Sequence, residues 1–344
     1  MHPIEAELKR VVDIGLPGAF VYTEDADGTS QFFTEGYANL ATQQRMTPTM
    51  HYRVGSTTKT FTAVVALQLM AEGKLALSDT LAARLPDLPA PNADVMTIEH
   101  LMRMRSGLFD FEDDSSLLGD LDAHLQPISL QHVLDLTVKH PAEFTPGEKF
   151  TYCNSNFCIL ERIIERITGN MLGQEFERRI FKPLGLENTS YPSEDDLGLP
   201  EPYIHGYERT VDGWRECSHV FFGRGDGALI STAVDLGKFF RALLIERRLV
   251  SADWMAQIMS VIEDNPPADE KYGLGLMAYP TPCATLWGHA GGGFGYGNLP
   301  YMRQYSGRFA ILMLNGTYGF RLPTTPNLPR PRFSPEFRAS LYCE

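Results

Sequence analysis

Apolar residues recur along this chain in two rhythms, one typical of helices and one typical of strands. Spacings of three and four residues, as in Ile4, Leu8 and Val11, predict helices, whereas short runs rich in β-branched and aromatic residues predict strands. Asp27-Gly28 is typical of a hairpin turn. The pattern predicts helices over residues 4–14, 56–73, 233–246 and 334–343, and strands over 19–23, 31–38, 272–279, 284–288 and 309–314.

The predicted strands lie near the two ends of the chain, whereas the middle consists of short predicted helices and long connections. This order predicts an α+β protein in which both termini build one sheet lobe and the middle is inserted as a helical lobe. We expect residues 1–50 and 225–344 to form the sheet lobe and residues 51–224 the helical lobe. The cleft between the lobes is the expected place for a site.

Composition and charge exclude several kinds of partner. The 344 residues are 43% hydrophobic and carry a formal net charge of -13, which would repel nucleic acid and anionic membranes, so neither is expected as a partner. The sequence has no run of 18 apolar residues, and residues 1–9 resemble an amphipathic helix more than a signal peptide. The chain as given is therefore expected in the cytoplasm, unless it is a mature form whose leader was removed.

The strongest chemical signal is the Ser-Thr-Thr-Lys run at 56–59, which opens a segment that is apolar from 61 to 70. Residues three apart on a helix share a face, so the Lys59 amine can reach the Ser56 hydroxyl. The unpaired N–H groups of a first helical turn also favour negative charge there. These features predict a nucleophilic serine. The alternative is an N-capping serine followed by a surface lysine.

A second segment, Tyr152-Cys153-Asn154, precedes a predicted helix. Tyr152 and Asn154 point the same way, and Tyr152 is expected to exchange a proton with Ser56 if the lysine cation keeps its phenolate accessible. Asn154 is expected to hold a substrate amide. The alternative is a buried tyrosine followed by a helix-capping asparagine.

A third segment begins at His289, after a predicted strand, and continues into glycines that allow a substrate to approach the backbone closely. The N–H groups of Gly292 and Ser56 are expected to form an oxyanion hole. The alternative is a structural histidine at the end of a strand.

Together these three segments make the chain resemble the class C-type serine beta-lactamase and DD-peptidase family of penicillin-recognising serine hydrolases. The pattern is closest to D-aminopeptidases and D-amino-acid amidases. The resemblance implies a beta-lactamase-like fold, with an antiparallel sheet flanked by helices and an inserted, mostly helical lobe. It also implies that Ser56 attacks a carbonyl, that Lys59 and Tyr152 move its proton, and that water releases the acyl-enzyme. His289 completes the implied catalytic set, and no cofactor or metal is implied.

The resemblance also narrows the substrate. DD-carboxypeptidases bind a terminal carboxylate with an arginine and threonines, but this chain has Met277, Ala290 and Gly292 in the corresponding segments, which disfavours that activity. Glu112, in a segment similar to the Asp-Phe-Glu of D-amino-acid amidases, is expected to bind a substrate ammonium. The alternative is that Glu112 belongs to a solvated acidic loop. Other candidates for contact with substrate are Phe109, Phe222, Ala290, Gly291, Met277, Phe294 and Tyr296.

These features favour a serine hydrolase that acts on amides or short peptides of D-amino acids with a free amino group. A DD-carboxypeptidase, an esterase or acyltransferase and a weak beta-lactamase that binds β-lactams remain alternatives, as does a slowly acylated penicillin-binding sensor with no turnover. The oligomeric state is not predicted.

The cysteines bear on the compartment. All five lack the spacing of a metal site, so zinc is not expected. Cys283, before the strand that leads to His289, and Cys343, in the last predicted helix, resemble the disulfide pair of a secreted relative. If formed, that bond would imply an oxidising compartment and a secreted mature form.

Overall fold

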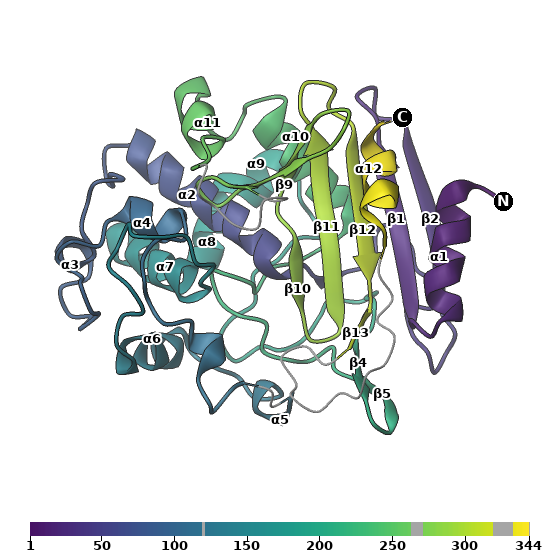
Figure 1. The fold of residues 1–344 in the computed structure, drawn as a ribbon, viewed down its shortest axis with the longest axis horizontal. Helices are drawn as coiled ribbons and strands as arrows, with labels where there is room; N and C mark the ends of the chain where they lie inside the picture. The colour runs from purple at the N-terminus through teal and green to yellow at the C-terminus, as the bar shows by residue number, and fades with distance from the viewer. Residues whose placement is uncertain (119–120, 263–270, 319–332, 344) are drawn as a thin grey trace.

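The centre of the computed structural model, which describes residues 1–118, 121–262, 271–318 and 333–343, is an antiparallel sheet between layers of helices (Figure 1). Its strands run in the order β2-β1-β12-β11-β9-β8-β7, with β10 paired to β11. The predicted α+β class is therefore confirmed. The strands are β1 (Gly18–Glu24), β2 (Ser30–Gly36), β7 (Lys271–Tyr272), β8 (Met277–Pro280), β9 (Thr285–Gly288), β10 (Gly291–Gly293), β11 (Tyr296–Arg303) and β12 (Phe309–Leu314).

The core has two layers, one on each face of the sheet, because successive side chains of the central strands point to opposite faces. Val21 and Leu312 pack with α1 and α12 on one face, whereas Phe20 and Ile311 join the larger cluster that contains α2 and α10. The helices are α1 (Pro3–Asp13), α2 (Thr58–Ala71), α3 (Leu81–Arg84), α4 (Ile98–Met102), α5 (Leu121–His124), α6 (Leu130–Lys139), α7 (Ser155–Thr168), α8 (Leu172–Phe176), α9 (Lys182–Leu184), α10 (Ala233–Leu244), α11 (Ala252–Ile258) and α12 (Pro335–Cys343).

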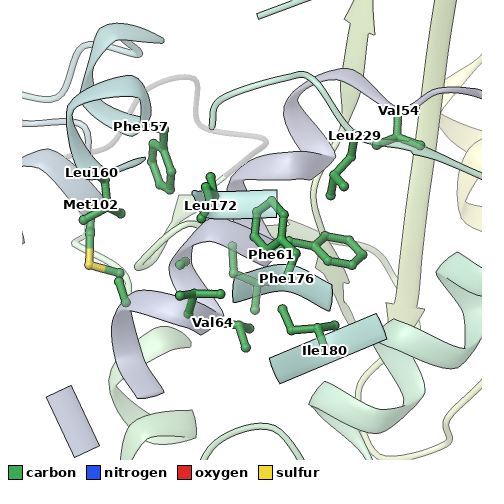
Figure 2. Packing of buried hydrophobic residues seen from close by; sticks show 14 of the residues in the cluster. Val54, Phe61, Val64, Met102, Phe157, Leu160, Leu172, Phe176, Ile180 and Leu229 are labelled. Carbon is green, nitrogen blue, oxygen red and sulfur yellow. The ribbon is translucent and has the colours of Figure 1, made fainter. Parts of the chain in front are cut away.

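Helix α2 is the buried axis of the larger cluster, and nearly all of its residues are shielded from solvent. The Phe61 ring stacks on that of Phe239 at 3.6 Å between centroids and meets Phe176 edge-on. Figure 2 shows Phe61 and Val64 of α2 within this packing. A helix that is apolar all round needs neighbours on every side, and its first turn is therefore held in the interior.

One predicted strand was wrong, and strand β11 was not predicted. Residues 272–279 form a hairpin and not one strand, because Gly275 takes a φ of +76° between β7 and β8. Strand β11 was missed, since Gly297 and Pro300 argue against a strand. Pro300 is tolerated because the ladder between β9 and β11 begins only at Tyr301.

The sheet takes its strands from both ends of the chain, as residues 18–36 and 271–314. Residues between them supply helices α2 to α11 and short strands. The lobe boundaries at 50 and 225 remain a prediction. There are two smaller sheets among the described residues. One pairs β3 (Tyr52–Arg53) with β6 (Ile230–Ser231). The other has the order β13 (Gly316–Thr317), β4 (Tyr207–Thr210), β5 (Gly213–Glu216).

No helix within the described ranges is both long enough and apolar enough to cross a membrane.

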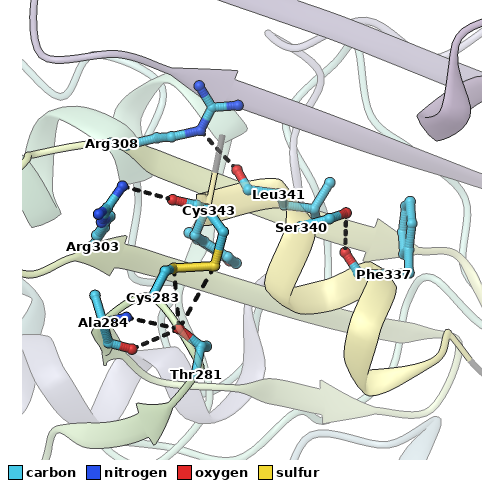
Figure 3. Close-up of a disulfide and its surroundings, with 10 residues drawn as sticks. Thr281, Cys283, Ala284, Arg303, Arg308, Phe337, Ser340, Leu341 and Cys343 are labelled. Carbon is cyan, nitrogen blue, oxygen red and sulfur yellow. Dashed lines mark hydrogen bonds between the residues drawn. A yellow bond between two sulfur atoms is a disulfide. The ribbon is translucent and has the colours of Figure 1, made fainter.

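A disulfide joins Cys283 to Cys343 and ties the end of α12 to the sheet (Figure 3). Thr281 Oγ1 lies 3.4 Å from Cys283 Sγ, and Arg308 Nε donates to Leu341 O at 2.8 Å. The bond closes a loop with a sequence separation of 60 residues. It fastens the last helix beside β9, the strand that leads to His289.

We expect the Cys343→Ser variant to lose about 4 kcal/mol of unfolding free energy, because the closed loop restricts the unfolded chain in the chain-entropy model. Urea denaturation measures the loss. Reductant should lower the stability of the wild type to that of the variant and leave the variant unchanged. Alkylation of both thiols in unreduced, folded wild type, detected by mass spectrometry, would contradict the bond.

Candidate active site

Ser56 lies in the 3-10 turn η1 (Gly55–Thr57), which leads directly into α2. Two neighbouring contacts tie this turn to the sheet. Thr57 Oγ1 donates to His289 O at 2.9 Å, and Asn298 Nδ2 donates to Val54 O at 2.9 Å. The turn is therefore fastened to β9 and β11, while the half-buried Ser56 side chain faces a pocket.

Lys59, the second residue of α2, is fully buried, so the surface lysine that the sequence left open as an alternative is excluded. Its Nζ lies 2.9 Å from Ser56 Oγ, 2.7 Å from Asn154 Oδ1 and 2.9 Å from Asp226 O. The Asp226 carboxylate is farther away, with Oδ2 at 3.9 Å. A charged lysine has three N–H donors, and these three acceptors use all of them.

The hydrogen-bond partners of Lys59 also determine where the lone pair points when the amine is neutral. Burial lowers the pKa of Lys59, against the opposing charge of Asp226, and so favours the neutral form. A neutral amine keeps two hydrogens and one lone pair. The oxygens of Asn154 and Asp226 can only accept, so they take the two hydrogens. The lone pair then faces Ser56, whose hydroxyl donates to it.

A buried carboxylate, Asp110, sets the orientation of Asn154. Asp110 Oδ2 accepts from Asn154 Nδ2 at 3.0 Å and from its backbone N at 3.1 Å, which leaves Oδ1 for Lys59. Asn154 occupies the N-cap position of α7 without a capping bond from its side chain. One N–H of Nδ2 and one lone pair of Oδ1 are thus used within the protein, and the substrate-amide contact expected from the sequence stays a prediction.

Tyr152 lies beside Ser56 and is held as a phenol. Burial raises the pKa of Tyr152 well above its usual value, and the hydrogen bond with Ser56 opposes this only in part. Lys59 Nζ lies 5.0 Å from the centre of the Tyr152 ring. The accessible phenolate expected from the sequence is therefore not favoured, and the neutral hydroxyl is the group presented to Ser56.

His289 lies in the interior with both ring nitrogens engaged. Nδ1 is 2.6 Å from Ala290 O, which can only accept, so Nδ1 carries the proton. Nε2 therefore accepts from the Tyr272 hydroxyl at 3.1 Å. Burial, helped by the charge of Lys59, lowers the pKa of His289 to about 3, and the ring is neutral at pH 7. Its direct partners are thus Tyr272 and Ala290, while Tyr152 is a ring neighbour at 6.3 Å.

Glycines let the strand β10 touch the turn that carries Ser56. Gly55 has a φ of +56°, and a Cβ on it would lie 2.7 Å from Gly292 N. A Cβ on Gly291 would lie 1.9 Å from Val54 O. The sequence assigned this glycine to close approach of a substrate, but its close neighbour is the chain's own backbone. Gly292 lines the pocket next to Ser56.

Three of the predicted substrate contacts line the pocket of Ser56: Glu112, Phe222 and Phe294. Acidic groups, aromatic rings and glycines share it with a second histidine, His124, and no lysine or arginine of the described chain is part of its wall. The lining is Gly55, Ser56, Glu112, Leu117, His124, Phe221, Phe222, Gly223, Asp226, Gly227, Gly292, Gly293 and Phe294.

Other predicted contacts lie elsewhere. The Phe109 ring stacks on His140 at 3.8 Å. Met277 Sδ accepts from Tyr301 OH at 3.8 Å, and the Met277 side chain packs against both hydrophobic clusters. Ala290 lies between β9 and β10, and Gly291 is the first residue of β10. Both are absent from the pocket wall, as is Tyr296, which packs edge-on against Phe222.

Sequence reasoning missed the residues that support the reactive groups: Asp110, Asp226, Tyr272 and Asn298. Asp110 lies two residues before Glu112, within a segment already singled out, and Asp226 lies between two glycines. These two positions were the signals in the sequence that could have led to Asp110 and Asp226. No group of three or more histidine, cysteine, aspartate and glutamate side chains suited to a metal occurs among the residues described.

The chain belongs to the Beta-lactamase family, since the family model matches residues 6–327. It is similar to a D-stereospecific amidohydrolase from Streptomyces sp., at 29% identity and a TM-score of 0.83, over 91% of this chain and 93% of the other. It is also similar to the D-amino acid amidase from Ochrobactrum anthropi SV3, at 25% identity and a TM-score of 0.82, over 92% and 91%. These neighbours confirm the predicted beta-lactamase-like fold.

Among curated relatives, the chain is 28% identical to a D-aminopeptidase from Gluconobacter oxydans over 247 residues, which are 70% of this chain and 45% of the relative. The chain thus spans about half the length of the curated relatives that it matches first.

The neutral state of His289 generates a pH dependence of stability. With its pKa lowered to about 3 in the folded chain, the unfolded chain binds a proton that the folded chain does not once the pH falls below 6.5. We expect the free energy of unfolding to fall between about pH 6 and about pH 4. The slope should be shallower in His289→Asn, by up to about 1.4 kcal/mol per pH unit. Urea denaturation across this range measures both slopes.

The control is His132→Asn, at an exposed histidine of α6, which should keep the wild-type slope. Equal slopes for wild type and His289→Asn would mean that the imidazole takes up its proton in the folded protein.

Proposed function

We propose that this protein is a serine hydrolase in which Ser56 is the nucleophile and Lys59 is its base. The observation that carries this proposal is the set of contacts around the buried amine, which directs its lone pair at Ser56 Oγ once Asn154 and Asp226 have taken its hydrogens. An adjacent base of this kind turns an ordinary serine into a nucleophile.

The proposed reaction has two halves. Ser56 Oγ attacks the carbonyl carbon while its proton passes to Lys59, and the resulting oxyanion accepts from the N–H groups of Ser56 and Gly292. Tyr152, which lies beside Ser56, gives a proton to the departing amine and then takes a proton from Lys59. Water then attacks the acyl-enzyme and delivers a proton to the same groups, which restores free Ser56 and releases the acid. His289 keeps Tyr272 in place behind this centre.

We propose amides or short peptides of D-amino acids with a free amino group as the substrates. Glu112 lines the pocket beside Ser56, and its carboxylate favours an ammonium and disfavours a terminal carboxylate. Phe221, Phe222 and Phe294 provide walls for an apolar side chain. The names of the similar proteins, a D-aminopeptidase and a D-amino acid amidase, support the same choice.

The disulfide bears on where the protein works. A bond between Cys283 and Cys343 persists in an oxidising compartment, so we propose a secreted or periplasmic setting over the cytoplasm.

The first test compares three substrates: D-phenylalaninamide, L-phenylalaninamide and an N-acylated D-Ala-D-Ala peptide. We expect the D-amide to have the highest kcat/KM and Ser56→Ala to lower it by at least about a thousandfold, because the nucleophile is lost. Ser78→Ala, at an exposed serine, is the matched control and should keep wild-type activity. Turnover of the N-acylated peptide alone would overturn the substrate proposal, and undiminished turnover by Ser56→Ala would overturn the mechanism.

The second test isolates the carboxylate of Glu112. We compare kcat/KM for D-phenylalaninamide with that for 3-phenylpropanamide, which lacks the ammonium. In Glu112→Gln the preference for the charged substrate should fall about tenfold or more, as expected for the loss of a charge-assisted hydrogen bond. Asp113→Asn, at the exposed neighbour, should keep the wild-type ratio. A ratio that is unchanged in Glu112→Gln would assign ammonium recognition to another group.

A further inference from the structure

A second pocket opens on the surface, and it shares no lining residue with the pocket of Ser56. Helix α8, the following π-helical turn η3 (Glu177–Phe181) and the segment 191–194 form its walls, together with Arg224. The lining is Met171, Leu172, Gly173, Gln174, Glu177, Arg178, Lys182, Tyr191, Pro192, Ser193, Glu194 and Arg224. No part of the proposed hydrolysis uses this pocket.

Arg224 is the unusual member of this wall. Its side chain is 4% exposed, yet its guanidinium makes no hydrogen bond to any residue that the structure describes, and Nε is completely buried without a partner. The guanidinium lies 5.1 Å from the centre of the Tyr191 ring, and the nearest carboxylate oxygen, Glu161 Oε1, is 3.6 Å from its terminal nitrogen. A buried guanidinium with unmet donors is costly unless an acceptor reaches it.

Glu161 is not that acceptor, because its nearest oxygen lies 3.6 Å from the guanidinium, beyond hydrogen-bond distance, and closer to other donors. Oε1 accepts from Tyr191 OH at 2.8 Å, and Oε2 accepts from Gly225 N at 2.7 Å. Burial also raises the pKa of Glu161 to about 7, so the charge opposite Arg224 is incomplete near neutral pH. The pair therefore leaves a positive charge and free donors at the pocket wall.

The rest of the lining restricts the chemistry of a ligand. Lys182 is paired with Glu177 at 3.4 Å, and Arg178 with Glu175 at 2.6 Å, and the side chains of both cations are more than half exposed. Glu194 adds a second carboxylate to the wall, which disfavours an anion with several charges. Met171, Leu172, Tyr191 and Pro192 provide an apolar surface.

We propose that this pocket is a binding site for a small molecule with a single carboxylate on an apolar body, and that the carboxylate pairs with Arg224. The planar guanidinium matches a carboxylate in two parallel hydrogen bonds. The apolar body lies against α8 and residues 191–192. The site adjoins the reactive centre through the backbone: Arg224 N donates to Asp226 Oδ1 at 2.8 Å, and Asp226 O accepts from Lys59.

The test measures binding and needs no turnover, so its result is separate from that of the proposed hydrolysis. Isothermal titration calorimetry with sodium 3-phenylpropanoate should give one saturable site on the wild type. This probe lacks an ammonium, and its carboxylate is repelled by that of Glu112 in the other pocket. Arg224→Gln should weaken binding at least about tenfold. Ser193→Trp, at an exposed serine of the rim, should block the pocket and abolish binding while Arg224 stays intact.

Arg166→Gln is the matched control, since Arg166 is an exposed arginine of α7 paired with Asp87, and it should bind the probe as the wild type does. If circular dichroism shows Arg224→Gln unfolded, Ser193→Trp decides alone. The proposal is overturned if the wild type gives no saturable binding, if binding survives Ser193→Trp, or if inorganic phosphate binds more tightly than the probe.

Discussion

A single buried amine is the constraint on which the site depends. Lys59 has no exposed surface, and each acceptor around it comes from a different part of the chain: the turn before α2, the start of α7 and the segment before β6. A lysine without water needs such partners to remain compatible with either charge state. The arrangement makes the serine reactive and at the same time joins three distant segments of the fold.

The residues around Asn154 and His289 each leave the side chain they contact only one hydrogen-bonding arrangement. An amide side chain can present either its oxygen or its nitrogen, and the carboxylate of Asp110 leaves Asn154 only one orientation. In the same way, the Ala290 carbonyl leaves His289 only one neutral tautomer. Neither group needs to touch a substrate to matter. Each converts an ambiguous hydrogen-bonding group into a defined one, which is how an interior site is preorganised.

The sequence predicted best what is local. Ser56 and Lys59 are three residues apart on one helical turn, so their contact follows from helix geometry alone. Asp226 contacts Lys59, and Tyr272 contacts His289, only because distant parts of the chain pack together. No sequence spacing predicts these two contacts. Strand β11 was missed for a related reason, because Pro300 is acceptable only where a neighbouring ladder has not yet begun. Met277 lies outside the pocket wall, because its position depends on how β8 pairs with β9 and not on its place in a motif.

The backbone contact between Gly55 and Gly292 has a consequence for motion. The two main chains touch there, and no side chains lie between them that could rearrange to let one segment slide over the other. The nucleophile and the edge strand beside it therefore move as one body, and a hinge cannot run between them. If the pocket widens to admit a bulky substrate, the opposite wall must move. There Glu112 and Leu117 belong to short turns and not to the sheet.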